Sequence, residues 1–430
     1  MRVTQWDARR WLVLILFGAL AARLAFIGLA GHTLTLQASG YDTYAVNIMS
    51  GHGYTRFEDR TADSDLPPLY IFFLVGVYST LGRSAVNVAL VQTLFDLVTI
   101  TLVYLIGRRA FPHSALPGLL GAAFTAFYPY MLFQDLSTND TAIFTMLLMA
   151  GVYGAFRVAD ALAANHTGGA LRWAVFIGVV YGLAALTKTV VVLMLPWLAL
   201  WWWRRGGFGR AFVVSAVAGL VLAAVVAPWA VRNSLLHGTL VLTSTNDGSN
   251  LHQGNNPLAA EYLANGWDVQ WLSFDMPEGL NEIEQAAWHR EQALKWLREN
   301  PDQWVRHFGQ KFLTLWNPQI TPYSVPPIER TSAAFVDDAV YQYETPLFQL
   351  ARTVHVVYYA PLLALAVAGL TLAVRQGQAV GPLMAVLLTI TLAYVIFHPS
   401  TRYRMPADPA VFLLAGYAVW WGVARGHAAR

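Results

Sequence analysis

The sequence predicts an all-α integral membrane protein, a bundle of about ten transmembrane helices with a small helical cap outside the membrane. Apolar residues make up 56% of the 430 residues and charged residues only 12%. The apolar residues gather in repeated runs, many of them long enough to cross a hydrocarbon core about 30 Å thick. One long polar stretch, residues 232–346, interrupts these runs, and it is therefore expected outside the membrane.

Ten apolar runs are predicted to span the membrane, within a range of nine to twelve. The first run lacks a small-residue cleavage site, so we expect a retained helix and not a signal peptide. These spans define an N-terminal transmembrane domain at 1–235 and C-terminal transmembrane helices at 347–430, separated by an extracytoplasmic helical segment at 236–346. The predicted spans are 11–31, 84–107, 115–134, 140–160, 171–187, 189–203, 209–231, 347–374, 380–397 and 405–424.

Arginines in the short loops set the orientation. All of them fall on one side, which the positive-inside rule assigns to the cytoplasm, so both termini are expected there. The run 67–82 would reverse every later loop if it spanned, and it is short and begins Pro-Pro. We therefore predict an interfacial or partly inserted helix, within a first outer loop at 32–83 that carries amphipathic helices. The arginines are Arg2, Arg9, Arg10, Arg108, Arg109, Arg157, Arg172, Arg204, Arg205, Arg210, Arg375, Arg425 and Arg430.

The polar segment is predicted to be helical and not an independent enzyme. Its stretch NEIEQAAWHREQALKWLREN has helical spacing, and Asn300-Pro301 ends that helix and starts another. The chain has no cysteine, which excludes thiol catalysis and disulfides. Its net charge of +3 is too small to indicate a nucleic-acid partner. It also lacks a phosphate-binding P-loop, HExxH and GxSxG.

Charged residues collect at the outer ends of the predicted helices. Such groups are costly near hydrocarbon, so their convergence on one side indicates a functional site. Acids and several bases facing one compartment suit an anionic, phosphate-bearing ligand placed beside a carboxylate. The residues concerned are Asp42, Asp135, Asp140, Lys188, Arg232, Arg402 and Arg404.

Three of these seven residues have a structural alternative, and so does Arg23. Asp42 could cap a short helix that ends at Gly51, and Asp140 could cap the fourth span. Lys188 could snorkel to the interface. Arg23, inside the first span, could snorkel or pair with a neighbouring helix.

Two further features of the outer face bear on ligand binding. Arg402 and Arg404 straddle Tyr403 on the outer side, against the positive-inside trend, and guanidinium groups suit forked binding of phosphate. Asp63-Ser64-Asp65 is similar to the acidic triplet that holds a metal ion in many sugar-nucleotide transferases. A three-residue pattern of this kind often occurs by chance, however, and this one lies in a charged, solvated loop.

Several segments, taken in order, carry a family resemblance. The first outer loop reads YDTYAVNIMSGHGYT and then PPLYIFFLVGVYSTLG; STNDTAIFTMLLM, GLAALTKTVV, APWAVRNSLLHG and HPSTRYRMPADP follow. Together they resemble the polytopic GT-C glycosyltransferases, in the bacterial branch related to protein O-mannosyltransferases and the lipid A aminoarabinose transferase. Asp140 stands where that family often has glutamate and Lys188 where it has arginine. Residues 255–345 match least.

The resemblance implies a GT-C-type bundle in a bacterial inner membrane, with a periplasmic active site. It implies an inverting hexosyl- or pentosyltransferase that moves a sugar from a polyprenyl phosphate to a hydroxyl on a lipid, glycan or protein acceptor. Asp42 would be the general base and Asp140 would assist; Lys188, Arg232, Arg402 and Arg404 would bind the donor phosphate. Relatives differ in needing a divalent cation, so the cofactor stays open. Further pocket candidates are Tyr44, His52, Tyr54, Asp135, His252 and Tyr403.

Three alternatives remain at this stage. An O-antigen ligase or polymerase would use a diphosphate-linked donor and would need more basic groups for the second phosphate. A polyprenyl-lipid transporter or flippase would show mid-membrane polar residues, broken helices and pseudo-symmetry, but the sequence has no evident internal repeat. An inactive assembly partner would retain the acids only as helix caps.

Overall fold

The computed structural model describes residues 5–31, 36, 40–57, 61–324, 326 and 346–428. Within these ranges the protein is almost entirely helical and forms no strand, with one isolated bridge between Trp267 and Ser324. The all-α prediction is therefore confirmed. Parts of the predicted outer loop and cap, together with two terminal arginines, lie outside the described residues: 32–35, 37–39, 58–60, 325, 327–345, Arg2 and Arg430.

Seven helices in the described part of the chain are long and apolar enough to span a membrane, and a bent pair would make an eighth. The chain is thus a multi-span membrane protein. All ten predicted runs are helical, but two of the helices are short, so the count of about ten crossings stays a prediction. The seven are α1 (Gln5–Ala30), α4 (Ala85–Ala110), α7 (Thr141–Ala163), α8 (Thr167–Ala185), α10 (Phe208–His237), α16 (Pro346–Arg375) and α19 (Asp408–Ala428), whose apolar stretch continues from α18 (Thr401–Arg404) through η8 (Met405–Ala407). The bent pair is α5 (Leu116–Ala126) with α6 (Pro129–Leu136), and the short helices are α9 (Met194–Gly206), which follows η3 (Thr189–Leu193), and α17 (Gly381–Ile396).

Close approaches between backbones hold the bundle together. Helix α7 is the most buried of the seven spans and α1 the least. A Cβ added at Gly107 of α4 would lie 2.5 Å from the Cα of Gly118 in α5, and one added at Gly369 of α16 would lie 2.0 Å from the carbonyl oxygen of Leu414 in α19. Small residues at such crossings allow the tight packing that stabilises helices in lipid, where the hydrophobic effect between helices is weak.

A buried ion triad joins α1, α4 and α6. Arg23 lies 2.5 Å from Asp96 and 2.8 Å from Asp135, and it also donates to the carbonyl of Ala126 at 2.9 Å. All three charged side chains are almost fully buried. The pairing interpretation of Arg23 is therefore confirmed, and the triad explains how an arginine is accommodated inside the first span.

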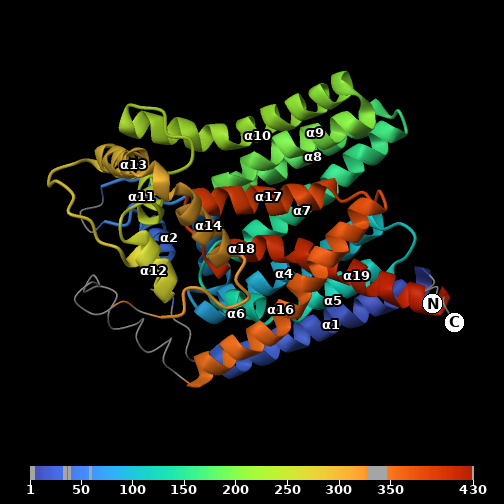
Figure 1. The fold of residues 1–430 in the computed structure, drawn as a ribbon. Coiled ribbons are helices and arrows are strands. Elements are labelled where there is room, and N and C mark those ends of the chain that lie inside the picture. The colour runs from blue at the N-terminus through green and yellow to red at the C-terminus, as the bar shows by residue number, and fades with distance from the viewer. Residues whose placement is uncertain are drawn as a thin grey trace.

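The cap covers one end of the bundle, and α1 begins and α19 ends at the opposite end (Figure 1). Its helix α13 begins with a capping box, in which Asn281 and Glu284 each accept from the other's backbone N–H. The predicted break at Asn300-Pro301 is confirmed, because α13 stops at Glu299. The cap consists of α11 (Asp247–Gly254), α12 (Ala259–Asn265), η4 (Val269–Trp271), α13 (Glu282–Glu299), η5 (Pro301–Gln303) and α14 (Trp304–Leu315).

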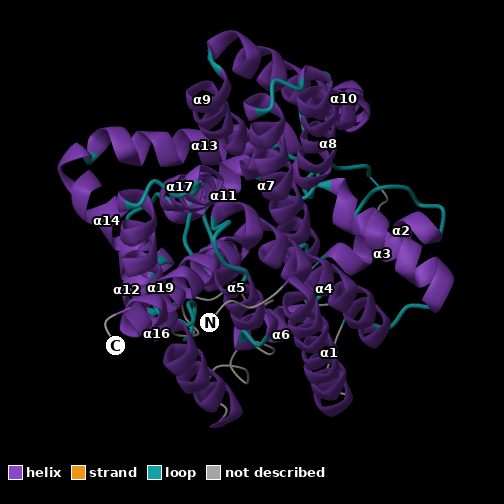
Figure 2. Ribbon diagram, turned by 90° about the vertical axis from the view of Figure 1, so that its right-hand side faces the viewer, coloured by secondary structure: helices purple, strands orange, loops and turns teal. Residues whose placement is uncertain are grey.

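The first outer loop contributes two short helices that pack on each other, α2 (Tyr41–Met49) and α3 (Pro68–Leu81) (Figure 2). After α2 the chain turns through Gly51 and Gly53, both with positive φ (77° and 82°), a conformation that glycine adopts freely. The Gly-His-Gly sequence is therefore a tight turn. Helix α3 has only 14 residues, and its depth in the membrane stays a prediction.

Candidate functional site

Three charged residues from distant segments meet at the cap end of the bundle. The Lys188 ammonium lies 2.5 Å from Oδ1 of Asp140, and the Arg402 guanidinium lies 3.4 Å from the same oxygen. Asp140 is buried, Lys188 nearly so, and the Arg402 side chain is 31% exposed. We call these three residues the cation cluster. Its two cations against one carboxylate leave one positive charge beside the membrane region.

The backbone conformation at each of the three residues directs its side chain toward the other two. Asp140 precedes α7 but makes no side-chain cap hydrogen bond; Asn139 accepts from the N–H of Thr141 instead. Asp140 therefore occupies the predicted N-cap position of α7 without capping it through its side chain, and its carboxylate is available to the cations. Lys188 lies between α8 and η3, where the chain is extended. Ser400 caps α18 by accepting from the N–H of Tyr403 and so fixes the helix that carries Arg402.

Tyrosines surround the cation cluster. Tyr403 stacks on Tyr394 with ring centroids 4.6 Å apart, and the Lys188 ammonium lies 5.5 Å from the Tyr403 ring centre. Tyr41 of α2 interacts electrostatically with Arg402, and its ring meets Tyr70 edge-on with ring centroids 5.0 Å apart. Aromatic faces stabilise a cation that is partly removed from water, so this setting suits a lysine and an arginine in a weakly hydrated site.

Asp42 follows Tyr41 directly but has other partners. Its carboxylate accepts from Arg83 at 3.0 and 2.5 Å and from the Tyr78 hydroxyl at 2.8 Å. The N-cap of α2 is Gly40, without a side-chain bond, so the capping interpretation of Asp42 is wrong. No hydrogen bond or ion pair among the described residues joins Asp42 to Asp140. Arg83 and Tyr78 were missed in the sequence, although an arginine on the outer side is the same signal that pointed to Arg402.

Arg404 points away from the cation cluster and is fully buried. It donates to the carbonyls of Leu315 and Asn317 at 3.3 and 2.5 Å and lies 3.3 Å from Asp408. Its guanidinium is also 3.9 Å from the ring centre of Tyr359. These contacts tie the end of α14 to the start of α19.

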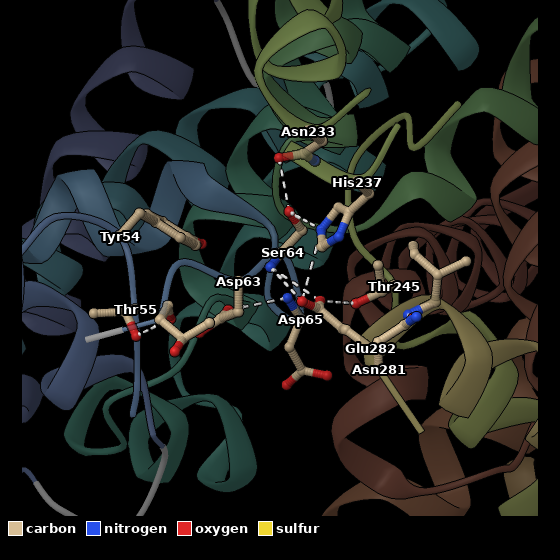
Figure 3. A network of polar contacts seen from close by, with 12 residues as sticks. Tyr54, Thr55, Asp63, Ser64, Asp65, Asn233, His237, Thr245, Asn281 and Glu282 are labelled. Atoms are coloured by element: carbon tan, nitrogen blue, oxygen red, sulfur yellow. Dashed lines mark hydrogen bonds and ion pairs between the residues drawn. The ribbon is translucent and has the colours of Figure 1, made fainter. Parts of the chain in front are cut away.

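Arg232 lies in a separate polar network under the first outer loop. It donates to the carbonyl of Asp63 at 2.6 Å and to the Ser64 hydroxyl at 2.9 Å, and it lies against the rings of Tyr54 and Trp229. The same network includes Asn233, His237 and Glu282, with Ser64 at its centre (Figure 3). The Arg232 guanidinium therefore joins the first outer loop to α10, and no contact among the described residues brings it to the cation cluster.

The remaining pocket candidates are spread over the molecule. Tyr44 donates to Asp63, and Tyr54 to the carbonyl of Leu66. Asp135 is part of the Arg23 triad. His52 is half-buried in the glycine turn. His252 lies in the cap with its Nδ1 3.0 Å from that of His289; burial, with His289 beside it, lowers the pKa of His252 to about 4. Of these six candidates, only Tyr403 contacts the cation cluster within the part of the chain that the structure describes.

The two aspartates of the Asp63-Ser64-Asp65 triplet both contact the nearby Arg56. Asp65 lies 2.7 Å from Arg56, and Asp63 accepts from the backbone N–H of Arg56 at 3.0 Å. Among the described residues, no three His, Asp or Glu side chains are grouped as they would be around a metal ion.

Part of this chain matches a known family model, and its fold resembles solved structures. The family model for dolichyl-phosphate-mannose-protein mannosyltransferases matches residues 65–231. Two structures of an oligosaccharyltransferase from Archaeoglobus fulgidus, each at 15% identity, align over 99% of this chain with TM-scores of 0.55 and 0.57. One is AglB with an inhibitory peptide and a dolichol-phosphate, and the other is an apo form. The fold is of the GT-C type. The predicted resemblance to GT-C glycosyltransferases is therefore confirmed for the fold.

The matches also have limits. This chain spans about half (52%) of the archaeal enzymes' length. ArnT from Cupriavidus metallidurans, bound to undecaprenyl phosphate, aligns at 16% identity over 95% of this chain and 77% of its own, with a TM-score of 0.42, which is too low to establish a common fold. No curated protein sequence matched this chain. The family model includes Asp140 and Lys188 and stops short of Arg402.

Proposed function

We propose that this chain is a glycosyltransferase that moves one sugar, a hexose or a pentose, from a polyprenyl phosphate to an acceptor hydroxyl. The reaction takes place on the side of the cap, which we assign to the periplasmic face of a bacterial inner membrane. The observation that carries the proposal is the cation cluster. Lys188 and Arg402 are held by Asp140 beside Tyr403, which the cap residue Gln270 contacts, in a fold of the GT-C type.

The cation cluster suits a phosphate whose lipid tail stays in the bilayer. Lys188 and Arg402 can both donate to phosphate oxygens, and charge-assisted bonds of this kind are about twice as strong as neutral ones. A sugar linked through a phosphodiester has one negative charge, which the single net positive charge of the cluster matches. A diphosphate would need more cations, so the charge favours a monophosphate donor over the ligase alternative.

In the proposed reaction, the acceptor oxygen attacks C1 of the sugar from the face opposite the phosphate. The bond from C1 to the phosphate oxygen breaks, and its electron pair leaves with the polyprenyl phosphate. Lys188 and Arg402 stabilise that leaving group. The configuration at C1 is inverted, and the proton of the acceptor hydroxyl passes to Asp42.

Asp42 is next in sequence to Tyr41, which interacts electrostatically with Arg402, so α2 brings both residues to the cap end of the bundle. Both of its oxygens now accept from Arg83 and Tyr78. The Arg83 side chain is half-exposed, so it can turn away and free one oxygen for the acceptor proton. Asp140, whose Oδ1 accepts from Lys188, orients the cations.

The test uses the purified protein and a radiolabelled sugar on a short-chain polyprenyl phosphate. We expect sugar transfer to envelope membranes, or slow hydrolysis, and neither with a nucleotide sugar. A lipid that co-purifies with the protein should be identified by mass spectrometry as a polyprenyl phosphate sugar. Movement of the intact donor across a vesicle membrane, without cleavage, would contradict the proposal and favour a flippase.

A further inference from the structure

Asp268 of the cap faces the cation cluster. It immediately precedes η4 and interacts electrostatically with Arg402 and Tyr403. Two residues later, the Gln270 amide donates to the Tyr403 hydroxyl at 2.9 Å. The segment from Trp267 to Gln270 is therefore a wall of the same site that holds Asp140 and Lys188, and it comes from the part of the chain that lies outside the membrane.

The Asp268 carboxylate keeps one oxygen without a partner. Oδ1 accepts from the N–H of Gln270 at 3.0 Å, and within the described ranges the second oxygen accepts no hydrogen bond. The side chain is half-buried, so this oxygen is open to a ligand. Asp42 and Asp140, by contrast, already accept from cationic side chains. Burial raises the pKa of Asp268, because removal from water disfavours the charged form. A hydrogen bond donated by a ligand would stabilise this poorly hydrated carboxylate.

The backbone around Asp268 is fixed. Gly266 has a φ of 69°, and a Cβ there would lie 2.3 Å from the ring of Tyr323, so only glycine fits. The Trp267 N–H donates to the carbonyl of Tyr262 at 2.9 Å, and the carbonyl of Gly266 accepts from the N–H groups of Tyr323 and Ser324. A carboxylate held in this way is pre-organised and can bind a hydroxyl without first being ordered.

We propose that Asp268 binds the acceptor, and that the group receiving the sugar is a neutral hydroxyl and not a phosphate or a carboxylate. This inference rests on the proposed function and names the acceptor side of the same site. The donor phosphate occupies the cations, so a second anion would meet both that phosphate and Asp268. A neutral hydroxyl can instead donate a hydrogen bond to the free oxygen of Asp268.

The experiment compares Asp268→Asn with a matched control, Asp275→Asn, which removes an exposed carboxylate from the same cap. Asparagine can still accept from the Gln270 N–H, so Asp268→Asn keeps the local cap and removes only the charge. The full-length proteins receive a labelled short-chain polyprenyl phosphate sugar and increasing amounts of envelope membranes from the source organism. Transfer is measured against membrane amount, and donor affinity is measured separately.

For Asp268→Asn we expect the half-saturating amount of membranes to rise about tenfold to a hundredfold, as for loss of a charged hydrogen bond, with donor affinity unchanged. Asp275→Asn should behave as wild type. Mass spectrometry of the labelled product should locate the sugar on a carbon-borne hydroxyl. Unchanged saturation in Asp268→Asn, or weakened donor binding, would overturn this inference alone. A sugar found on phosphate would overturn both this inference and the hydroxyl acceptor of the proposed function. If wild type transfers nothing, the proposed function fails, and the inference fails with it.

Discussion

Replacing Lys188 by methionine gives the sharpest test of the cation cluster. The ammonium is nearly buried and lies 2.5 Å from Asp140, so its removal deletes one of the two cations assigned to the donor phosphate. A hydrogen bond to a charged group contributes about 1.5–3 kcal/mol. Donor binding should therefore weaken roughly 10- to 150-fold, because each 1.4 kcal/mol is a factor of ten.

A less stable Lys188→Met protein could also bind the donor more weakly, even if Lys188 did not contact the phosphate. Without Lys188, the buried Asp140 keeps only Arg402 at 3.4 Å, and breaking a buried ion pair costs about 3–5 kcal/mol when the remaining charge is left unpaired. The double variant Asp140→Asn with Lys188→Met removes both charges. Its thermal stability should recover toward wild type, whereas its donor affinity should stay low, because the phosphate ligand is still missing.

The measurement is the Kd for a short-chain polyprenyl phosphate in lipid nanodiscs, with thermal unfolding followed on the same samples. Lys295→Met, which removes an exposed lysine of α13, is the matched control and should change neither quantity. Lys188→Arg should retain most of the affinity, since it keeps the positive charge. Wild-type donor affinity in the double variant would refute the assignment and leave Lys188 as a structural partner of Asp140.

Three further predictions concern other residues. Asp42→Asn should lower transfer by about 10²–10⁴-fold with donor Kd unchanged, as expected for a general base, and normal turnover would exclude that role. Arg404→Met should lower the free energy of unfolding by about 3–5 kcal/mol, because it leaves the buried Asp408 without its cationic partner, while donor affinity of the folded protein stays normal; weakened donor binding would instead place Arg404 at the phosphate. The pKa of His252 is about 4 in the folded cap against an ordinary 6.5, so its stability contribution is complete above pH 6.5 and is lost as the pH falls toward 4. Tryptophan fluorescence of thermal unfolding should show this decline in wild type and a shallower one in His252→Gln; equal declines would contradict it.

The membrane class and most helices could be predicted from the sequence. Long apolar runs must be helical in lipid, because no water satisfies an exposed backbone there, and all ten predicted runs are helical. Asp140, Lys188 and Arg402 could also be selected, since charges at helix ends near hydrocarbon need a partner or a function. The sequence predicted that they gather on one side of the membrane. Which of them make direct contact could not be predicted, because they lie on segments more than forty residues apart in sequence.

What each charge contacts was decided by tertiary structure. Arg402 and Arg404 look equivalent in the sequence STRYRMP, but residues two apart on a helix do not face the same way. Packing of α18 turns Arg402 to Asp140 and Arg404 to the carbonyls at the end of α14. Packing also decides the partner of Asp42: α2 lies against α3, and Arg83, just after the end of α3, pairs with Asp42. The sequence by itself determined which groups are too costly to leave unpaired near lipid, because that cost depends on residue type and neighbouring hydrophobicity. Only the folded chain decided the pairs, because a salt bridge depends on distances of a few ångströms between segments that hydropathy cannot place relative to one another.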